Sequence, residues 1–176
     1  NNSALLLKNS TGREQYHRLF ESTRQFGEPG VIWSHSTEQL FNPCVEISLY
    51  GYDEQGNSGW QACNLSTING AKLQTKENFA LAAKVASIIG TLQAGYTDFD
   101  YLGKVSESII RREALLGVSM TGIMDYPNIT LDKNNLREMA GIVLQTNEDI
   151  ANKIGINVAA RATCVKPEGT ASCLLG

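Results

Sequence analysis

Hydrophobic and polar positions follow two spacings along this chain. Short apolar runs and alternating positions are typical of β-strands, and they predict strands at about 4–7, 31–33, 45–49, 60–68, 115–120 and 156–165. Apolar residues three and four positions apart are typical of helices, and they predict helices at about 11–26, 76–94, 104–114 and 133–154, with a further helix from Thr170. Strands that alternate with helices favour an α/β fold with parallel neighbouring strands, open or closed into a barrel.

The ends of the two longest helices carry their own signals. Thr75 and Asp132 are suitable N-caps, and Gly95 and Gly155 are suitable stops. The 76–94 segment has apolar residues around most of its circumference, which predicts a helix buried on several sides.

Composition fits one folded domain. Of the 176 residues, 42% are hydrophobic and 19% are charged, and a chain of this length is too short to expect two cores. A net charge of −3 argues against a broad nucleic-acid-binding surface. No apolar run reaches the length of a membrane span. We therefore expect neither nucleic acid nor a membrane among the partners.

The cysteines are too few for a disulfide scaffold. Four are present, none in a Cys-x-x-Cys pair, and the two histidines lie near neither cysteine pair, so we expect no metal site. Functional thiols in a reducing cytoplasm fit this pattern best. Arg111 and Arg112 are predicted to form a solvated helix face.

The segment from Asn42 to Glu46 combines three kinds of chemistry. If it is extended, the side chains of Asn42, Cys44 and Glu46 project to one side. One nucleotide sugar could then contact a hydrogen-bonding amide, a thiol and a carboxylate that can act as a base.

Three motif blocks resemble the catalytic subunit of ribonucleotide reductase, and they occur in that family's order: 42–49, 60–69 and 167–172. The first block reads Asn-Pro-Cys, whereas Asn-Leu-Cys is more usual in the oxygen-dependent iron enzymes. The resemblance therefore leans toward the adenosylcobalamin-dependent class.

This resemblance implies a ten-stranded α/β barrel with a central finger loop. Cys44 at the loop tip would become a thiyl radical that removes the ribose 3′-hydrogen. Glu46 would take the 3′-hydroxyl proton, and Asn42 would hold the sugar hydroxyls. Cys63 would be half of a reducing dithiol whose partner lies in an earlier strand that this chain does not contain. Cys164 and Cys173 are expected to be structural thiols.

The third block implies a site for the substrate phosphates at the turn between a strand and a helix. Its residues are Pro167, Glu168, Gly169, Thr170, Ala171 and Ser172, with Ser3 as a further candidate. A carboxylate is unfavourable beside a phosphate, so we expect that of Glu168 to point away.

We expect residues 1–176 to be a fragment of a single catalytic barrel domain with both ends truncated, because the chain begins at Asn1 without methionine and stops in the first turn of a helix. The implied partners are a ribonucleotide substrate, a thioredoxin-type reductant and the remainder of the parent chain. Adenosylcobalamin is the implied cofactor, although no residue of this chain can be assigned to bind it.

Three alternatives stay open. The radical could arrive from a separate diiron or dimanganese subunit, as in the class I large subunit. The chain could be a non-catalytic nucleotide-binding barrel. It could also be a thiol oxidoreductase that uses Cys44 and Cys63 as a redox couple, although it lacks the Cys-x-x-Cys signature.

Overall fold

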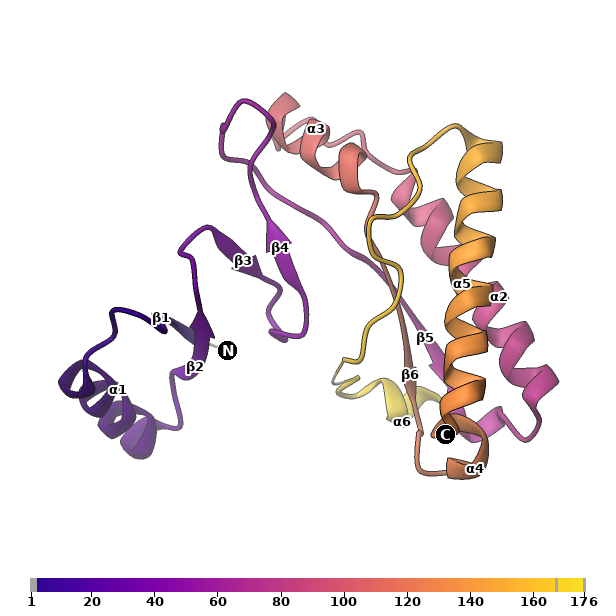
Figure 1. The fold of residues 1–176 in the computed structure, drawn as a ribbon, viewed down its shortest axis with the longest axis horizontal. Helices are drawn as coiled ribbons and strands as arrows, with labels where there is room; N and C mark the ends of the chain where they lie inside the picture. Colours follow the sequence, from indigo (N-terminus) through magenta and orange to yellow (C-terminus); the bar gives the residue numbers. More distant parts are fainter. Residues whose placement is uncertain (1–2, 167, 176) are drawn as a thin grey trace. The chain divides into compact units, whose positions relative to one another are not determined.

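The computed structural model describes residues 3–166 and 168–175 (Figure 1). They form two compact units, which divide between Tyr50 and Gly51. No helix within these residues is both long enough and apolar enough to cross a membrane.

The first unit begins with a β-α-β arrangement. Strand β1 (Ser3–Leu7) and strand β2 (Gly30–Ser34) are parallel, and helix α1 (Arg13–Phe26) connects them. The ring of Tyr16 in α1 stacks on that of Trp33 in β2, with ring centroids 5.8 Å apart. The helix thus packs on the strand pair, as the alternating pattern predicts.

An antiparallel hairpin completes the first unit. Strand β3 (Gln39–Phe41) pairs with strand β4 (Ser48–Tyr50), and Leu40 lies opposite Leu49. The strand predicted at 45–49 is therefore only partly correct, because the chain turns through residues 42–47 before β4 begins.

The second unit contains a pair of parallel strands covered by two long helices (Figure 1). Its elements are β5 (Asn64–Asn69), the 3-10 helix η1 (Gly70–Lys72), α2 (Lys76–Ala94), α3 (Gly103–Glu113), β6 (Leu116–Thr121), α4 (Pro127–Thr130), α5 (Lys133–Ile154) and α6 (Ala171–Leu175). Helix α2 lies against β5, β6 and α5. The shared core includes Ile68, Phe79, Ala83, Val118, Met139 and Val143.

The segment predicted as a strand at 156–165 pairs over only a few residues. The amides of Leu116 and Val118 donate to the carbonyls of Arg161 and Ala162, and the amide of Cys164 donates back to Val118. The preceding residues bond elsewhere: Ala159 N–H donates to the Asn147 side chain, and Ala160 N–H donates to the Glu113 carbonyl. A strand at 156–160 therefore does not form, and β6 lies between β5 and residues 161–164.

Helix α2 differs from its predicted burial. Its side toward the strands and α5 is buried, but an apolar stripe on its other side is exposed among the described residues: Leu81, Val85, Ile89 and Leu92. The α/β class is confirmed. The described strands form three two-stranded sheets, so the ten-stranded barrel stays a prediction.

Candidate functional site

The hairpin between β3 and β4 ends in a tight turn that closes on Asn42. The amide of Val45 donates to the Asn42 carbonyl at 2.9 Å, and the amide of Ile47 donates to Asn42 Oδ1 at 3.1 Å. The expectation that residues 42–46 are extended is therefore wrong, because the Asn42 side chain and carbonyl hold a turn.

Val45 is the residue of this turn with a strained backbone conformation. Its φ angle is +65°, in the left-handed region that a β-branched side chain rarely adopts. Such outliers persist where neighbouring bonds fix the backbone, as those of Asn42 do here.

Cys44 lies at the tip of the turn, and its thiol is exposed. The carboxylate of Glu46, two residues later, is different. Both of its oxygens are buried, and neither has a hydrogen-bond partner within the described part of the chain. A buried carboxylate without a partner is costly, so Glu46 has an unused capacity to accept a proton or hydrogen bond beside the thiol segment.

The second unit presents a polar face on the side of its strands away from α2. Ile68 and Val118 point into the core, and successive residues in a strand point to opposite faces. Thr67 and Ser119 therefore lie on the other face. Hydroxyl groups of this face contact the C-terminal segment of the chain.

The predicted phosphate turn lies across the carboxyl ends of β5 and β6. Thr67 Oγ1 donates to Glu168 Oε2 at 2.6 Å, and Asn69 Nδ2 donates to the Leu175 carbonyl at 2.9 Å. The carboxyl ends of parallel strands are the usual place for ligands in α/β proteins.

A pocket of about 400 Å³ opens beside this turn, lined by Met120, Thr121, Gly122, Ile123, Met124, Asp125, Lys166 and Glu168. The Glu168 carboxylate is held by β5, and its second oxygen, Oε1, is buried without a hydrogen-bond partner in the described residues. Gly169 has a φ of +58°, a conformation suited to glycine. The turn therefore combines a cation, a fixed carboxylate and a glycine bend.

Not every predicted phosphate residue can be placed with this turn. Pro167 lies outside the described residues, and so does the side chain of Ser172. Ser3 is exposed at the start of β1 in the first unit, whereas the turn belongs to the second unit.

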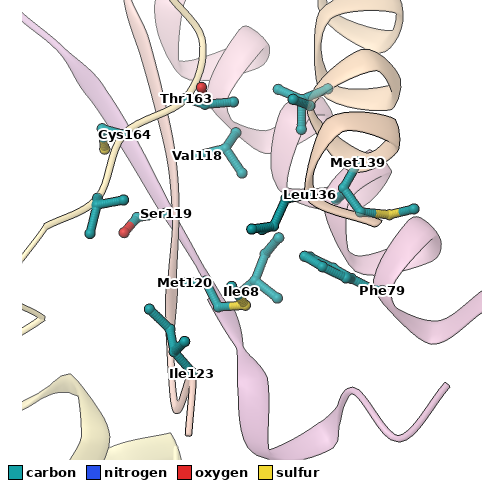
Figure 2. Close-up of a pocket in the computed structure, with 14 residues that line it drawn as sticks. Ile68, Phe79, Val118, Ser119, Met120, Ile123, Leu136, Met139, Thr163 and Cys164 are labelled. Atoms are coloured by element: carbon teal, nitrogen blue, oxygen red, sulfur yellow. The ribbon is translucent and has the colours of Figure 1, made fainter. Parts of the chain in front are cut away.

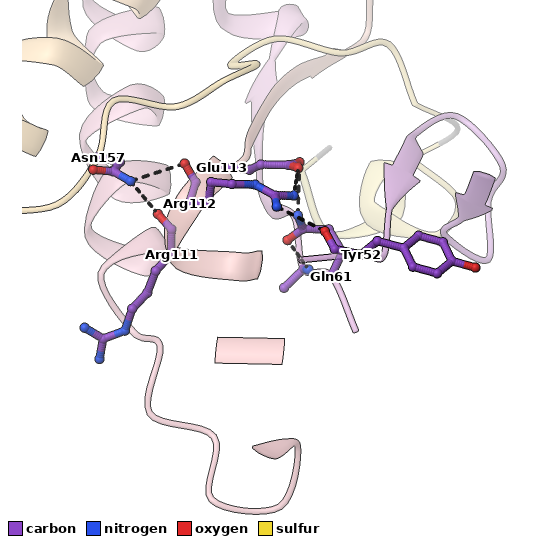
Figure 3. A network of polar contacts seen from close by, with 7 residues as sticks. Tyr52, Gln61, Arg111, Arg112, Glu113 and Asn157 are labelled. Atoms are coloured by element: carbon purple, nitrogen blue, oxygen red, sulfur yellow. Dashed lines mark hydrogen bonds and ion pairs between the residues drawn. The ribbon is translucent and has the colours of Figure 1, made fainter. Parts of the chain in front are cut away.

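Cys63 directly precedes β5, and a polar network fixes the segment that leads to it. Arg112 Nη1 donates to the Tyr52 carbonyl at 3.0 Å. Gln61 Nε2 donates to Glu113 Oε2 at 3.0 Å, and Arg112 forms an ion pair with Glu113 at 2.7 Å. Figure 3 shows these side chains converging beside the end of α3. The network anchors the chain two residues before Cys63.

The network was not foreseen from the sequence. Arg111 is exposed as predicted, with 59% of its side chain accessible, but Arg112 is only 31% accessible and is engaged on two sides. The one available signal was the adjacent Glu113, which leaves a carboxylate next to a guanidinium at the end of a helix.

A second pocket, of about 380 Å³, lies between the strands and helices α2 and α5. Figure 2 shows Phe79, Leu136 and Met139 on its helix side, with Ser119 and Cys164 on the far side of Val118. The lining is almost wholly apolar, so this pocket offers no cation for phosphate. It is a poor candidate for the substrate.

The remaining ionisable side chains do not gather into a metal centre within the described residues, where no group of three or more histidine, cysteine, aspartate or glutamate side chains could hold an ion. Cys164 is half-buried beside β6, and Cys173 is exposed in α6. We expected Cys173 to be a structural thiol, and its exposure does not support that role.

Comparison with known proteins adds relatives that match nearly the whole chain. The adenosylcobalamin-dependent ribonucleoside-triphosphate reductases of Lactobacillus delbrueckii subsp. bulgaricus and Lactobacillus leichmannii are 26% identical over 92% of this chain, and that of Lactobacillus gasseri is 26% identical over 93%. The chain spans about a quarter of the length of these relatives (26–27%). No family model matches.

A solved structure gives the same result for the fold. A B-12 dependent (class II) ribonucleotide reductase aligns over 100% of this chain and 29% of its own, with a TM-score of 0.67 and 23% identity. The resemblance predicted from the three motif blocks is thereby confirmed.

Proposed function

We propose that this chain is part of the catalytic barrel of a ribonucleotide reductase, which replaces the ribose 2′-hydroxyl with hydrogen. In this proposal residues 1–176 are a fragment of one ten-stranded α/β barrel domain, and the 42–47 turn is its central finger loop. The α/β fold, the parallel strand pairs and the named relatives support the assignment.

The observation that carries the proposal is the carboxylate of Glu46, two residues from Cys44, which is buried and has no hydrogen-bond partner among the residues that the structure describes. A general base needs a free lone pair within reach of the proton it takes. In the proposed reaction the Cys44 thiyl takes the hydrogen atom from C3′, which leaves a thiol and a carbon radical. Glu46 then accepts the 3′-hydroxyl proton.

Asn42 orients the sugar in this scheme. Its Oδ1 is used within the turn, so the amide nitrogen is the group assigned to the sugar hydroxyls. The same hydrogen bond fixes the position of Cys44 relative to Asn42, since both lie in the closed turn. A radical thiol needs exclusion of water, and Cys44 is exposed. We assign its cover to parts of the parent barrel outside this chain.

Cys63 supplies reducing power in the proposal. Together with a second cysteine of the parent chain it gives two electrons and two protons as the 2′-hydroxyl leaves as water, and the pair ends as a disulfide. A thioredoxin-type dithiol protein restores the thiols. These steps require a reducing compartment such as the cytoplasm.

The turn at 168–172 takes the substrate phosphates, with Lys166 at the edge of the adjoining pocket. Main-chain amides of the turn and the Thr170 hydroxyl are the assigned donors. The relatives' name favours a ribonucleoside triphosphate over a diphosphate.

Adenosylcobalamin is the proposed radical source, as the relatives' name indicates. No described residue can be assigned to hold it, so we assign its binding groups to parts of the parent chain outside these residues.

Turnover by the complete protein that contains this sequence tests the proposal. With adenosylcobalamin, a dithiol and a ribonucleoside triphosphate, we expect deoxyribonucleotide without a second subunit. Cys44→Ser abolishes product but preserves nucleotide binding, and Cys173→Ser, at an exposed thiol, serves as the matched control. Activity that requires a separate metal subunit favours the class I alternative. If the unaltered protein binds nucleotide but shows no turnover, the proposed enzymatic function is wrong, and the result favours the non-catalytic nucleotide-binding barrel.

A further inference from the structure

Cys63 and Cys164 approach the same point on the polar face of the second unit. A Cβ atom built on Gly117 would lie 3.3 Å from Cys63 Sγ and 3.0 Å from Cys164 Sγ. The two sulfur atoms therefore cannot be farther apart than the sum of these distances. Both thiols are half-buried, whereas Cys44 and Cys173 are exposed.

The strand arrangement explains this convergence. Gly117 lies in β6, opposite Leu65 of β5, while the 161–164 segment runs along the other edge of β6. Cys63 and Cys164 thus come from the two flanking segments. Because Gly117 has no side chain, the two sulfurs and the side chain of Leu65 share the space above the middle strand, with Leu65 Cδ2 nearer to that Cβ position than either sulfur.

We propose that Cys63 and Cys164 form a local disulfide when an oxidant of the disulfide or peroxide class is present. The inference that this link affects catalysis rests on the function proposed above, but the link itself does not. A disulfide requires an S–S distance of about 2.05 Å. Cys63 and Cys164 lie on the two segments that flank β6, so their backbones are roughly 9–10 Å apart, farther than the roughly 4.4–6.8 Å between Cα atoms that a disulfide usually spans. Closing the link therefore requires residues 161–164 to move away from their place along β6, where only a few backbone hydrogen bonds hold them.

The chemistry balances with oxidised glutathione. One cysteine thiolate attacks the glutathione disulfide, forms a mixed disulfide and releases one glutathione thiolate. The second cysteine then attacks the protein sulfur of that mixed disulfide and releases the other glutathione. Two protein thiols are oxidised, one glutathione disulfide is reduced, and two protons leave.

This link would occupy Cys63 and so remove it from substrate reduction. The site is therefore a redox modification site at which Cys164 competes for the thiol assigned to the reaction. A disulfide between Cys164 and Cys63 would inhibit substrate reduction reversibly, because a dithiol reductant restores both thiols.

Peptide mapping tests the link directly. Digestion with trypsin and a glutamate-specific protease separates the four cysteines, with Cys44 in 39–46, Cys63 in 55–72, Cys164 in 162–168 and Cys173 in the peptide after Glu168. After exposure of the folded chain to oxidised glutathione, we expect peptide 55–72 joined to 162–168. Because these cysteines lie roughly 100 residues apart, we expect at least about tenfold less of this link when oxidation is done in urea.

Variants separate this proposal from the catalytic one. In Cys164→Ser, Cys63 retains glutathione as a stable mixed disulfide, whereas Cys173→Ser still forms the link. In the complete protein treated with oxidised glutathione, we expect the link between peptides 55–72 and 162–168 in the unaltered chain and its absence in Cys164→Ser. Retention of glutathione on Cys63 in the unaltered, folded chain overturns the proposal, and so does equal linkage of Cys63 to Cys44 or Cys173. Because the mapping needs no turnover, either proposal can fail without the other.

Discussion

The hydroxyl of Thr67 donates a 2.6 Å hydrogen bond to Oε2 of Glu168, a residue 101 positions later in the sequence. This contact joins the middle of β5 to the proposed phosphate turn. The other carboxylate oxygen is buried without a partner in the described residues. The Thr67 hydroxyl is therefore one of the groups that hold the turn to the strands, together with the side chain of Asn69.

Replacing that hydroxyl should loosen the turn. Thr67→Val leaves Oε2 of Glu168 without its donor, and an unsatisfied buried acceptor costs about 1–3 kcal/mol. We expect a loss of that size in the free energy of unfolding measured in urea. Thr67→Ser, which keeps the hydroxyl, is the control and should retain most of the stability. Equal losses in both variants would show that the methyl group of Thr67 matters instead of the hydrogen bond.

The strained residue in the hairpin offers a stabilising change. Val45 has a φ of +65°, and the left-handed conformation costs roughly 1–2 kcal/mol for an ordinary residue. Asparagine tolerates this region, so Val45→Asn should raise the thermal midpoint of the first unit, followed by Trp33 fluorescence. Val45→Gly should gain less, because glycine adds entropy to the unfolded chain. No gain from either variant would mean that the Val45 side chain compensates its strain by packing.

Substitution by alanine should change stability in opposite directions at two glycines of the second unit, Gly70 and Gly141. A Cβ on Gly70 would clash with the backbone carbonyl oxygens of Thr121 and Gly122, whereas nothing lies near one on Gly141 in α5. Gly70→Ala should therefore destabilise the chain by about 1–3 kcal/mol. Gly141→Ala should stabilise it by about 0.5–1 kcal/mol, since alanine is the better helix former. Calorimetry of both variants provides the comparison.

Acid should weaken the anchor at the start of α3. A hydrogen bond from Lys104 lowers the pKa of Glu107 from its ordinary value of 4.5, and Arg111 contributes further. Stability from a lowered carboxyl pKa is complete above the unfolded value and is lost as the pH falls through the folded one. We expect Glu107→Gln to flatten the fall of the thermal midpoint below about pH 5. Because salt screens the exposed charges of Lys104 and Arg111, about 1 M NaCl should bring the unaltered chain closer to the variant. An unchanged slope would contradict the assignment.

The two longest helices were predictable because their signals are local. Thr75 accepts a hydrogen bond from the Asn78 amide, and Asp132 accepts one from that of Asn135. The observed bounds of α2 and α5 therefore follow the caps and the terminal glycines read from the sequence. The three motif blocks likewise predicted the relatives, since each block is a contiguous segment.

The secondary-structure predictions were wrong where hydrogen bonds from side chains determine the backbone conformation, and one side-chain contact was missed. Residues 156–160 have the composition of a strand, but the buried side chain of Asn147 takes the Ala159 amide. The Asn42 segment alternates like a strand, yet its own side chain closes a turn. The approach of Cys63 to Cys164 depends on Gly117 in the strand between them. No spacing within the sequence indicates that these three residues meet.

The conformation of the 42–47 turn is set by hydrogen bonds within the turn itself. Asn42 accepts hydrogen bonds from the amides of both Val45 and Ile47. The backbone around Cys44 therefore keeps its conformation without contacts from other parts of a protein. Whatever surrounds this tip in a larger assembly has only to fit around it. The loss of conformational entropy on ordering the tip is offset by hydrogen bonds within residues 42–47 themselves.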